Sequence, residues 1–437
     1  ALSSAASDVY KRQPFYMRKF IIFNPKIIMD DWGNVLKFGK DRSSAAEYKN
    51  NLLKKAILSY LTTHEEATIA DLSNELTWSV PTVTKLIQEL KEEGYLTDLG
   101  KLETAGGRRP NVFGLAADAF YFLGVDIRRR RLEFVLLDFK GYILHKKQEV
   151  PFVLENTPEA LEQVCQETEK FISEIGMNRK EIIGIGFSLT GRVDSNSGYS
   201  YTYFNFNEIP LTEVLQQRLG IRAYIENDSR AMMYAEKTAG VVKEEKNVIF
   251  LNIGRGVGVG ILIDNKLYSG KTGFAGEFGH IPLFPNEILC SCGKKGCLET
   301  EASGLALEKM FVEHMKAGET SVLSKQWKKG KEILLYDIIQ AAHNDDMLAI
   351  SLISEIAEKL GRGVGILINL LNPELIVIGG TLSLVGDYFM LPLKTAINKY
   401  ALSLISKDTC FKISKLGDNA SVLGVAMLIR AKIMNIL

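Results

Sequence analysis

The sequence has few cysteines and no long apolar run. Its five cysteines are an odd number in a chain of 437 residues, which argues against a disulfide framework. No stretch reaches the roughly 18 uninterrupted apolar residues of a membrane-spanning helix, because polar residues break even the most apolar segment, Gly363 to Gly380. The start of the chain lacks an apolar core followed by a cleavage site, so secretion is not indicated and the cytoplasm is the expected compartment.

An excess of charge of one sign is also missing. The 53 Lys and Arg side chains nearly balance the 52 Asp and Glu side chains, and the formal net charge is +1. This balance excludes a strongly basic protein that coats nucleic acid without specificity, but it leaves room for a local DNA-binding surface. The length of the chain favours two or three domains.

Residues 46–114 follow the pattern of a winged helix-turn-helix domain, after an N-terminal extension (1–45) that we expect to be partly disordered. Apolar residues recur on one helix face at Leu53, Ala56, Ile57, Tyr60 and Leu61. A second helix is expected over 68–76, and a third begins after Ser79, a residue type suited to capping, and ends at Gly94. Short strands at 95–97 and 101–103 with a turn near Gly100, followed by the segment 106–110, predict a wing with a basic tip.

The DNA-facing residues of such a domain are expected on the polar side of the third helix and at the wing. They are Ser79, Thr82, Lys85, Gln88, Arg108 and Arg109. From Ser44 to Gly114 the chain has eight Lys and Arg against ten Asp and Glu, so DNA binding must depend on the local placement of cations and on doubling in a dimer. A small helical module that docks onto another protein is the alternative interpretation.

From Phe120 onward the pattern becomes α/β. Three strands are expected at 121–126, 131–139 and 142–148, and a helix follows over 158–175. A second cycle begins with strands at 247–252 and 257–263. Two similar halves predict two lobes (118–245 and 246–419) with a ligand cleft between them, and a C-terminal helix (420–437) that packs back on the first lobe.

Three cysteines and one histidine have the spacing of a metal site: His280, Cys290, Cys292 and Cys297. Three thiolates and an imidazole suit tetrahedral Zn²⁺. Since four protein ligands leave no open position, a zinc ion here would be structural rather than hydrolytic. Free buried thiols or a redox-active pair are the alternatives.

Two glycine-rich segments and one polar strand end are candidates for ligand binding. Gly254, Gly256 and Gly258 lie near a junction between predicted strands, and Gly379 and Gly380 end a later one; phosphate loops use such glycines, but so do hairpins. Asn227 and Asp228 stand where a strand leads into a helix. They can bind or deprotonate a sugar hydroxyl, or simply cap the helix.

Taken together, these segments resemble the ROK family of repressors and sugar kinases, from about Leu52 to the C-terminus. Gly256, Gly258, Gly260, Gly270, Gly276, Gly279 and His280 match its signature, and Glu299 follows the cysteine motif as in its zinc motif. The resemblance implies a two-lobed, actin-like (ribonuclease H-like) ATPase fold. It also implies sugar contacts from Asn227, Asp228, Glu277, His280 and Glu299, with His280 binding zinc through one ring nitrogen and a sugar hydroxyl through the other.

The nucleotide side departs from the family's kinases. Asp126 remains at the end of the first strand, but arginines replace the glycines of the first phosphate loop, and Arg255 and Val259 replace smaller residues in the second. Bulky side chains keep backbone N–H groups away from a phosphate. Gly379 and Gly380 of the adenosine segment are retained.

This pattern predicts a sugar-responsive transcriptional repressor without enzymatic activity, similar to the xylose and N-acetylglucosamine repressors of the family. Its partners would be operator DNA, a small sugar effector and a second copy of the chain, in a homodimer or tetramer without membrane insertion. The alternative is an ATP-dependent, glucokinase-like sugar kinase in which Asp228 is the catalytic base. The loop 199–207 is expected to contribute to sugar specificity.

Overall fold

The computed structural model describes residues 45–101 and 109–434. The first part is a winged helix-turn-helix. Its elements are α3 (Ala45–His64), β1 (Glu66–Thr68), α4 (Ile69–Glu75), α5 (Val80–Glu92), β2 (Leu96–Lys101) and β3 (Asn111–Leu115). The three strands form an antiparallel sheet in the order β1-β3-β2.

Local capping sets the ends of the helices in this domain. Thr68 caps α4, with its hydroxyl accepting from the N–H of Asp71 while the Asp71 carboxylate accepts from the N–H of Thr68. Ser79 caps α5 as predicted, accepting from the N–H of Thr82. Beneath the helices, the buried Lys54 ammonium of α3 pairs with Glu89 and Glu93 of α5. A pair of salt bridges thus joins α3 to α5.

The predicted strands of the wing were partly wrong. β2 does not turn near Gly100 but runs through it to Lys101, because a bulge between Asp98 and Gly100 accommodates the Gly100 φ of +101°. The strand that pairs with β2 is β3, whose Val112 and Phe113 are buried. Of the strand expected at 101–103, Lys101 belongs to β2, and the other two residues lie outside the described residues. The tip of the wing, including Arg108, and the N-terminal extension lie outside the described residues.

The first lobe is built on a five-stranded sheet in the order β10-β7-β4-β5-β6. Its strands are β4 (Tyr121–Ile127), β5 (Arg131–Leu137), β6 (Ile143–Pro151), β7 (Ile182–Leu189) and β10 (Ala223–Asn227), and its helices are α6 (Pro158–Glu174), α7 (Leu211–Leu219) and α8 (Asp228–Ala239). The short strands β8 (Val193–Asp194) and β9 (Tyr199–Ser200) pair with each other. Apolar side chains of α6 and α7 pack on one face of the five-stranded sheet.

The second lobe repeats this topology in the order β13-β12-β11-β14-β15. Its strands are β11 (Val248–Ile253), β12 (Val257–Ile263), β13 (Lys266–Leu267), β14 (Leu375–Gly379) and β15 (Cys410–Ile413). Its helices are α9 (Leu298–Ala302), α10 (Gly304–Lys316), α11 (Ser324–Lys328), α12 (Leu335–His343), α13 (Met347–Leu371), α14 (Asp387–Tyr400) and α15 (Ser403–Asp408). In both lobes three consecutive strands are antiparallel and two later strands add in parallel. The predicted duplicated α/β fold is therefore confirmed.

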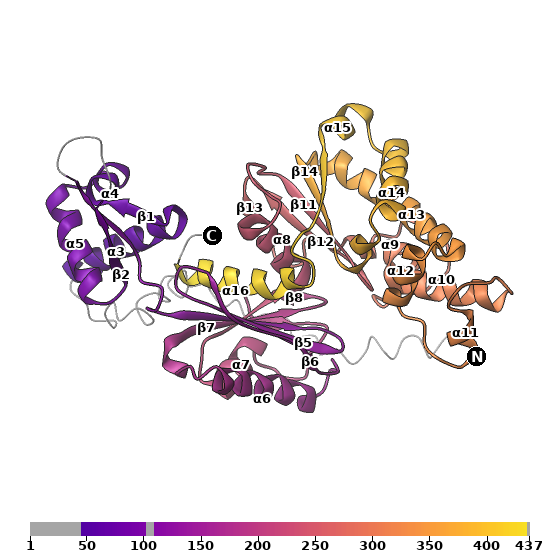
Figure 1. Cartoon of the computed structure of the whole chain (residues 1–437), viewed down its shortest axis with the longest axis horizontal. Coiled ribbons are helices and arrows are strands. Elements are labelled where there is room, and N and C mark those ends of the chain that lie inside the picture. Colours follow the sequence, from indigo (N-terminus) through magenta and orange to yellow (C-terminus); the bar gives the residue numbers. More distant parts are fainter. Residues whose placement is uncertain (1–44, 102–108, 435–437) are drawn as a thin grey trace, which may run out of the picture. The chain divides into compact units, whose positions relative to one another are not determined.

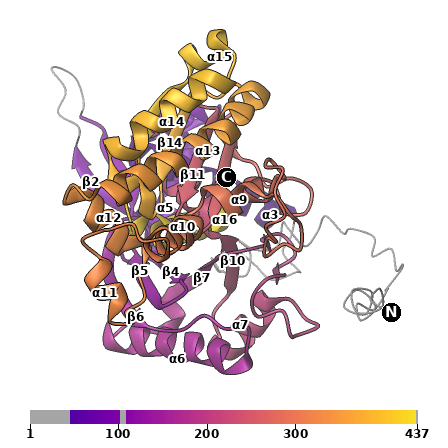
Figure 2. The same cartoon turned by 90° about the vertical axis from the view of Figure 1, so that its right-hand side faces the viewer.

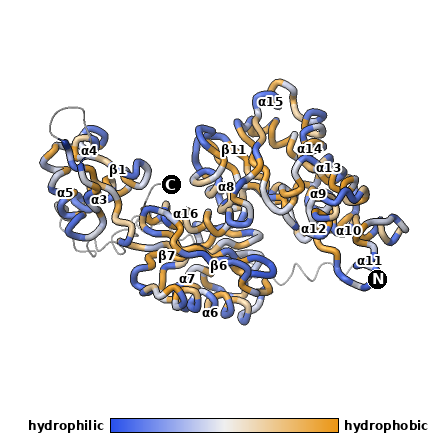
Figure 3. Tube along the Cα trace, in the orientation of Figure 1, coloured by the Kyte–Doolittle hydropathy of each residue, from blue (hydrophilic) through white to orange (hydrophobic). Residues whose placement is uncertain are grey.

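The C-terminal helix α16 (Asn419–Met434) lies between the five-stranded sheet of the first lobe and α8. It covers the face of the first sheet opposite α6 and α7 (Figures 1 and 2), and its other side contacts α8. Gly124 and Gly186 of the sheet leave room for it. Figure 3 shows α16 as largely hydrophobic, whereas α6 alternates between hydrophobic and hydrophilic residues, as expected of a helix buried on both sides and a helix with one exposed face.

Among the described residues, no helix combines the length and the apolar character that crossing a membrane requires.

Candidate functional site

The polar junction between β10 and α8 has the conformation of a helix cap. The Asn227 side-chain oxygen accepts from the N–H groups of Ser229 (3.0 Å) and Arg230 (3.2 Å), and its amide donates to the carbonyl of Gly191. Asp228 accepts from the N–H of Ser229 at 2.7 Å through one carboxylate oxygen, Oδ1. Asn227 is thus the capping residue, and the capping interpretation is confirmed for it. Helix capping does not exclude ligand binding here, because within the described residues one amide hydrogen of Asn227 and the Oδ2 of Asp228 have no hydrogen-bond partner.

Asp228 has an unusual acidity. Crowding by protein atoms and the nearby negative charge of Asp126 raise the pKa of its carboxyl to about 6, although part of the side chain still meets solvent. A carboxyl with this pKa changes charge close to neutral pH. It is therefore suited to exchanging a proton with, or hydrogen bonding to, a hydroxyl group.

Arg230 ties this junction to two neighbouring loops. Its guanidinium is buried and bonds the Glu226 carboxylate at 2.7 Å, the carbonyl of Val193 at 2.8 Å and the carbonyl of Gly273. Val193 belongs to the first lobe, whereas Gly273 belongs to the loop that leads to Glu277. Arg230 was missed by the sequence reasoning, and no helical spacing rule could have revealed it, because Glu226 lies on β10 and Arg230 on α8.

Strand β12 brings the predicted sugar residues of the two lobes together. Alternate residues of a strand share a face; Gly258 and Gly260 stand on one face of β12, and Gly256 directly precedes the strand. A Cβ on Gly256 would meet the Glu299 carboxylate, and one on Gly258 would meet the side chain of Ser229, which follows Asp228. Glu299 also accepts from the N–H of Val257 at 3.1 Å. These glycines let α8 and Glu299 approach the strand side by side.

Glu277 and His280 lie on a single 3-10 turn, η2 (Phe278–His280), next to the same end of β12. Gly279 faces the carbonyl of Val257 and the side chain of Glu299. The His280 Nε2 lies 3.8 Å from the Glu277 carboxylate. Glu277, His280 and Glu299 therefore form one group beside the first turn of α8.

The four predicted metal ligands also come together. Their ligand atoms all lie within 4.8 Å of one another. The Nδ1 of His280 is 3.4 Å from the Cys290 sulfur, and the sulfurs of Cys292 and Cys297 are 3.6 Å apart. Two thiolates on one tetrahedral zinc ion, each at about 2.3 Å, would be separated by about 3.8 Å. The Cys3His cluster therefore fits a metal ion.

The orientation of His280 connects this metal site to the group around Glu277. Its Nδ1 faces Cys290 and its Nε2 faces Glu277. A metal ion on Nδ1 would fix the ring and leave Nε2 to carry the hydrogen. His280 can therefore serve both sites at once, each through a different nitrogen.

The turns predicted to have lost nucleotide binding contain arginine ion pairs. At the end of β4, the Arg128 Nε donates to Asp126 at 2.7 Å, while Ser421 of α16 donates to the other Asp126 oxygen at 2.9 Å. Arg128 also bonds Asp418 and lies 3.5 Å from the buried Glu133. Both oxygens of Asp126 are thus occupied by side chains of the protein.

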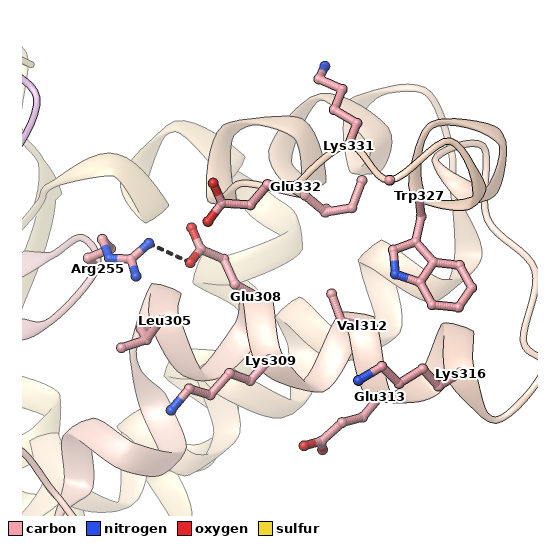
Figure 4. A pocket seen from close by; sticks show the side chains of 12 residues that line it. Arg255, Leu305, Glu308, Lys309, Val312, Glu313, Lys316, Trp327, Lys331 and Glu332 are labelled. Atoms are coloured by element: carbon pink, nitrogen blue, oxygen red, sulfur yellow. Dashed lines mark hydrogen bonds and ion pairs between the residues drawn. The ribbon is translucent and has the colours of Figure 1, made fainter.

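The equivalent turn of the second lobe, between β11 and β12, is occupied in the same way. Arg255 donates to Glu308 of α10 at 2.7 Å (Figure 4). The carbonyls of Gly254 and Arg255 accept from the N–H groups of Gly304 and Leu305, so these helix-terminal donors do not face a ligand. Gly379 lies against the ring of Phe250, and Gly380 has a φ of +79°. The Phe250 ring leaves no room for a side chain at Gly379, and the positive φ favours glycine at 380, so neither residue needs a bound nucleotide to explain it.

In the winged helix, the exposed face of α5 differs in part from the prediction. Lys85 and Gln88 are exposed, and Arg109 is exposed at the base of the wing. Thr82 is half-buried, and its hydroxyl contacts that of Ser79 at 2.8 Å. Thr84, four residues before Gln88, is exposed on the same stripe of α5 as Lys85 and Gln88.

The fold and this site define a two-lobed α/β protein of the actin-like ATPase class joined to a winged helix. The ROK family pattern matches residues 122–432, and a winged helix-turn-helix DNA-binding pattern matches residues 51–97. The chain belongs to the ROK family, as its sequence motifs predicted.

Its relatives include both regulators and kinases. The chain is 34% identical over 352 residues to the xylose repressor of Caldicellulosiruptor bescii, which covers 80% of this chain and 88% of the repressor. A solved ROK family transcriptional regulator, a homolog of the E. coli MLC protein, superposes with a TM-score of 0.74 at 26% identity and covers 87% of this chain and 97% of its own. The ROK family glucokinase of Streptomyces griseus, solved with glucose and AMPPNP, has a TM-score of 0.61 at 27% identity over 70% of this chain and 98% of its own.

Proposed function

We propose that this protein is a sugar-responsive transcriptional repressor of the cytoplasm. It binds operator DNA through its winged helix and a monosaccharide, or a derivative of one, between the lobes. One observation carries the proposal: a winged helix is joined to a ROK domain in which both phosphate turns are held in arginine ion pairs, Arg128 with Asp126 and Arg255 with Glu308. The similarity to a xylose repressor over most of both chains supports it.

The sugar would be held by carboxylates and one imidazole. Asp228 offers its Oδ2 to a hydroxyl, and Glu277 and His280 offer adjacent groups from η2. Glu299 is already anchored by the N–H of Val257, so it is a rigid acceptor. Rigid, satisfied groups lose little conformational entropy when a ligand binds.

Zn²⁺ is the ion proposed for His280, Cys290, Cys292 and Cys297, because three thiolates and an imidazole suit it and leave no open position. When bound, the ion supplies structure rather than acid catalysis. The His280 ring is held with its Nε2 toward Glu277, where this nitrogen can donate a hydrogen bond to a sugar oxygen.

The response to sugar would pass through the lobes to the DNA-binding domains of a dimer. Asp228 and Asn227 belong to the first lobe and Glu277, His280 and Glu299 to the second, so a sugar that contacts both groups favours one inter-lobe angle. In a dimer, that angle sets the spacing of two recognition helices relative to half-sites on DNA. A sugar that binds one angle more tightly therefore lowers operator affinity.

A mobility-shift assay tests the proposal. The full chain is incubated with DNA from the region upstream of its own gene, with and without a panel of aldopentoses, aldohexoses and N-acetylated hexosamines. We expect a shifted band that one sugar class removes, and we expect Asp228→Asn to keep the DNA shift but lose the sugar effect. If no DNA is shifted even at low salt, the repressor proposal is wrong.

The wing and α5 give a second arm of the same assay. Arg108→Ala with Arg109→Ala should weaken binding to all sequences and reduce the slope of log K against log salt by about 2, since each phosphate contact contributes roughly 0.9. Thr84→Ala and Gln88→Ala should change the preference among sequences. Lys146→Ala, an exposed lysine on β6, is the matched control and should change neither.

The second candidate function is a sugar kinase, favoured by one observation: Asp228 keeps the place and the raised pKa of a catalytic base. A coupled assay for ADP release with the same sugars discriminates the two. Turnover that depends on sugar and disappears in Asp228→Asn would establish the kinase.

A further inference from the structure

The connection between the winged helix and the first lobe is short and is fixed at both ends. Residues 116–120 form it, between the end of β3 and the start of β4. On the side of the winged helix, the N–H of Ala116 donates to the carbonyl of Tyr95 at 3.0 Å. On the side of the lobe, the carbonyl of Ala117 accepts from the N–H of Phe139, also at 3.0 Å. A segment held in this way differs from a flexible linker, which would let the two domains move independently.

Aromatic rings pack along the same connection. The Phe120 ring stacks on that of Tyr95, with the ring centroids 5.7 Å apart, and meets the Phe139 ring edge to face at 5.9 Å. Phe139 in turn stacks on Phe122 of β4 at 6.4 Å. Tyr95, Phe122 and Phe139 are buried, whereas Phe120 is partly buried. Phe120 is therefore the ring that joins the core of the lobe to the winged helix.

Tyr95 also fixes the end of α5, the helix expected to contact DNA. Its N–H donates to the carbonyl of Leu90 in α5 at 2.9 Å, while its own carbonyl accepts from Ala116. A movement of residues 116–120 therefore acts on the C-terminal end of this helix.

Helix α16 reaches the same connection from the sugar site. The Arg430 Nε donates to the carbonyl of Phe139 at 3.0 Å, and a Cβ on Gly141 would lie 3.3 Å from the guanidinium. The turn between β5 and β6 is thus held against α16. The same helix packs on α8, where Tyr234 shares a buried cluster with α16 side chains. The first residue of α8 is Asp228, one of the predicted sugar contacts.

We propose that these contacts form a joint that couples the sugar site to the recognition helix, and that Phe120 is its positioning residue. The role of this joint rests on the proposed function, since it carries the effect of a sugar bound between the lobes to α5. A sugar that favours one inter-lobe angle shifts α8 and, with it, α16. Arg430 passes that shift to Phe139, and the packed rings pass it to Tyr95. Because residues 116–120 are fixed at both ends, the shift changes the direction of α5.

Arg430 gives α16 a reason to move. Its Nη2 is buried and has no hydrogen-bond partner among the residues that the structure describes. A buried N–H without a partner costs free energy. Asp138 directly precedes Phe139 and carries a buried carboxylate. A displacement of α16 that brings Nη2 to this carboxylate would satisfy the N–H, so α16 has a second position that a bound sugar can select.

The size of the sugar effect on DNA binding tests the joint. The operator Kd of the full chain is measured with and without the member of the sugar panel that removes the DNA shift, and the ratio of the two values is the coupling. Phe120→Ala should lower this ratio at least fivefold, while calorimetry shows a sugar affinity within twofold of that of the natural protein. Arg430→Met should lower the ratio as well, and Phe120→Leu, which keeps an apolar contact, should lower it less. Tyr142→Ala, at a 58% exposed aromatic residue of the same hairpin turn, is the matched control and should leave it unchanged.

Hydrogen exchange tests the joint without DNA or sugar. In Phe120→Ala the amides of residues 116–120 and 138–142 should exchange at least tenfold faster than in the natural protein, whereas those of β7 should be unchanged, which also shows that the variant is folded. Unchanged exchange at the joint would overturn the proposal. A natural protein without any sugar effect on DNA contradicts the repressor proposal itself, whereas a Phe120→Ala variant that responds to sugar as the natural protein does contradicts only the joint.

Discussion

The Nε of Arg128 lies 2.7 Å from the Oδ2 of Asp126, and this pair occupies the end of the first strand of the first lobe. The same guanidinium lies beside Glu133 and Asp418. Asp126 and Glu133 are almost completely buried, with exposed fractions of 2% and 0%. Arg128 is therefore the counter-ion of Asp126, and it shares Glu133 with Arg131, whose Nε donates to Glu133 at 2.9 Å. The turn that carries Arg128 is fixed by charge as well as by hydrogen bonds.

Arg128→Ala should lower the free energy of unfolding by about 3 kcal/mol, because removing one partner of a buried ion pair leaves carboxylates uncompensated. Burial already raises the pKa of Glu133, so the loss should shrink as the pH falls and the carboxyl groups take up protons. Urea denaturation measures both effects. Arg129→Ala, on the exposed tip of the same turn, is the control; if it costs as much, the ion pair is not the cause.

Sugar affinity should depend on pH through Asp228, whose pKa burial and Asp126 raise to about 6. Below that pH the carboxylate becomes protonated, and the ionised fraction falls about tenfold per pH unit. Calorimetry between about pH 5 and pH 8 should show weaker sugar binding at the acidic end. In Asp228→Asn the affinity should be low and independent of pH in this range; a pH profile unchanged from that of the natural protein would contradict the assignment.

The raised pKa of Asp228 also makes the stability of the fold depend on pH. Stability changes with pH in the opposite direction to sugar affinity, because the folded state favours the protonated carboxyl group. The unfolded chain ionises Asp228 near its ordinary pKa of 3.8, whereas the folded chain does so only near 6. The contribution of this group to stability is therefore largest below pH 3.8 to 4 and declines as the pH rises toward 6. The difference in stability between the natural protein and Asp228→Asn, measured by urea denaturation, should follow this window.

Cys292→Ser should release the metal ion and weaken the sugar response, because η2 and Glu277 depend on His280 being held. Elemental analysis should find about one zinc per natural chain and much less in the variant, with a lower melting temperature. Cys410→Ser, at an exposed cysteine of β15 outside the cluster, is the matched control and should keep the ion. Zinc missing from the natural protein would overturn this expectation.

Gly424→Ala should destabilise the protein by about 2 kcal/mol, as overpacking does. Alanine is normally the better helix former by about 1 kcal/mol, but in α16 its Cβ would overlap the backbone carbonyl of Ala231 in α8. Thermal denaturation measures the change. Gly254→Ala is the control, since a Cβ there would lie 3.9 Å from the side-chain oxygen of Thr381 and should cost little.

Much of the architecture could be predicted because it depends on local patterns. The helix face of α3, the cap at Ser79 and the repeated strand pattern of the two lobes all follow from residue spacing. The wing was harder, because glycine marks bulges as well as turns, and only the pairing of β3 with both neighbours shows which one Gly100 makes. The residue pattern of one strand does not specify which other strand it pairs with.

The candidate site likewise has one part that the sequence predicts and one part that only the tertiary structure shows. The residue types and spacing of His280, Cys290, Cys292 and Cys297 predicted from the sequence alone a cluster that could hold a metal ion, and the structure brings these four side chains together. Only the tertiary structure decided that Arg230 bridges loops of both lobes, that Arg128 satisfies Asp126, and that Arg255 turns toward Glu308. Arg128 finds Asp126 two residues away, but it also reaches Asp418, which is 290 residues further along the chain, and Arg255 and Glu308 are 53 residues apart. No local spacing rule specifies which carboxylate an arginine will meet.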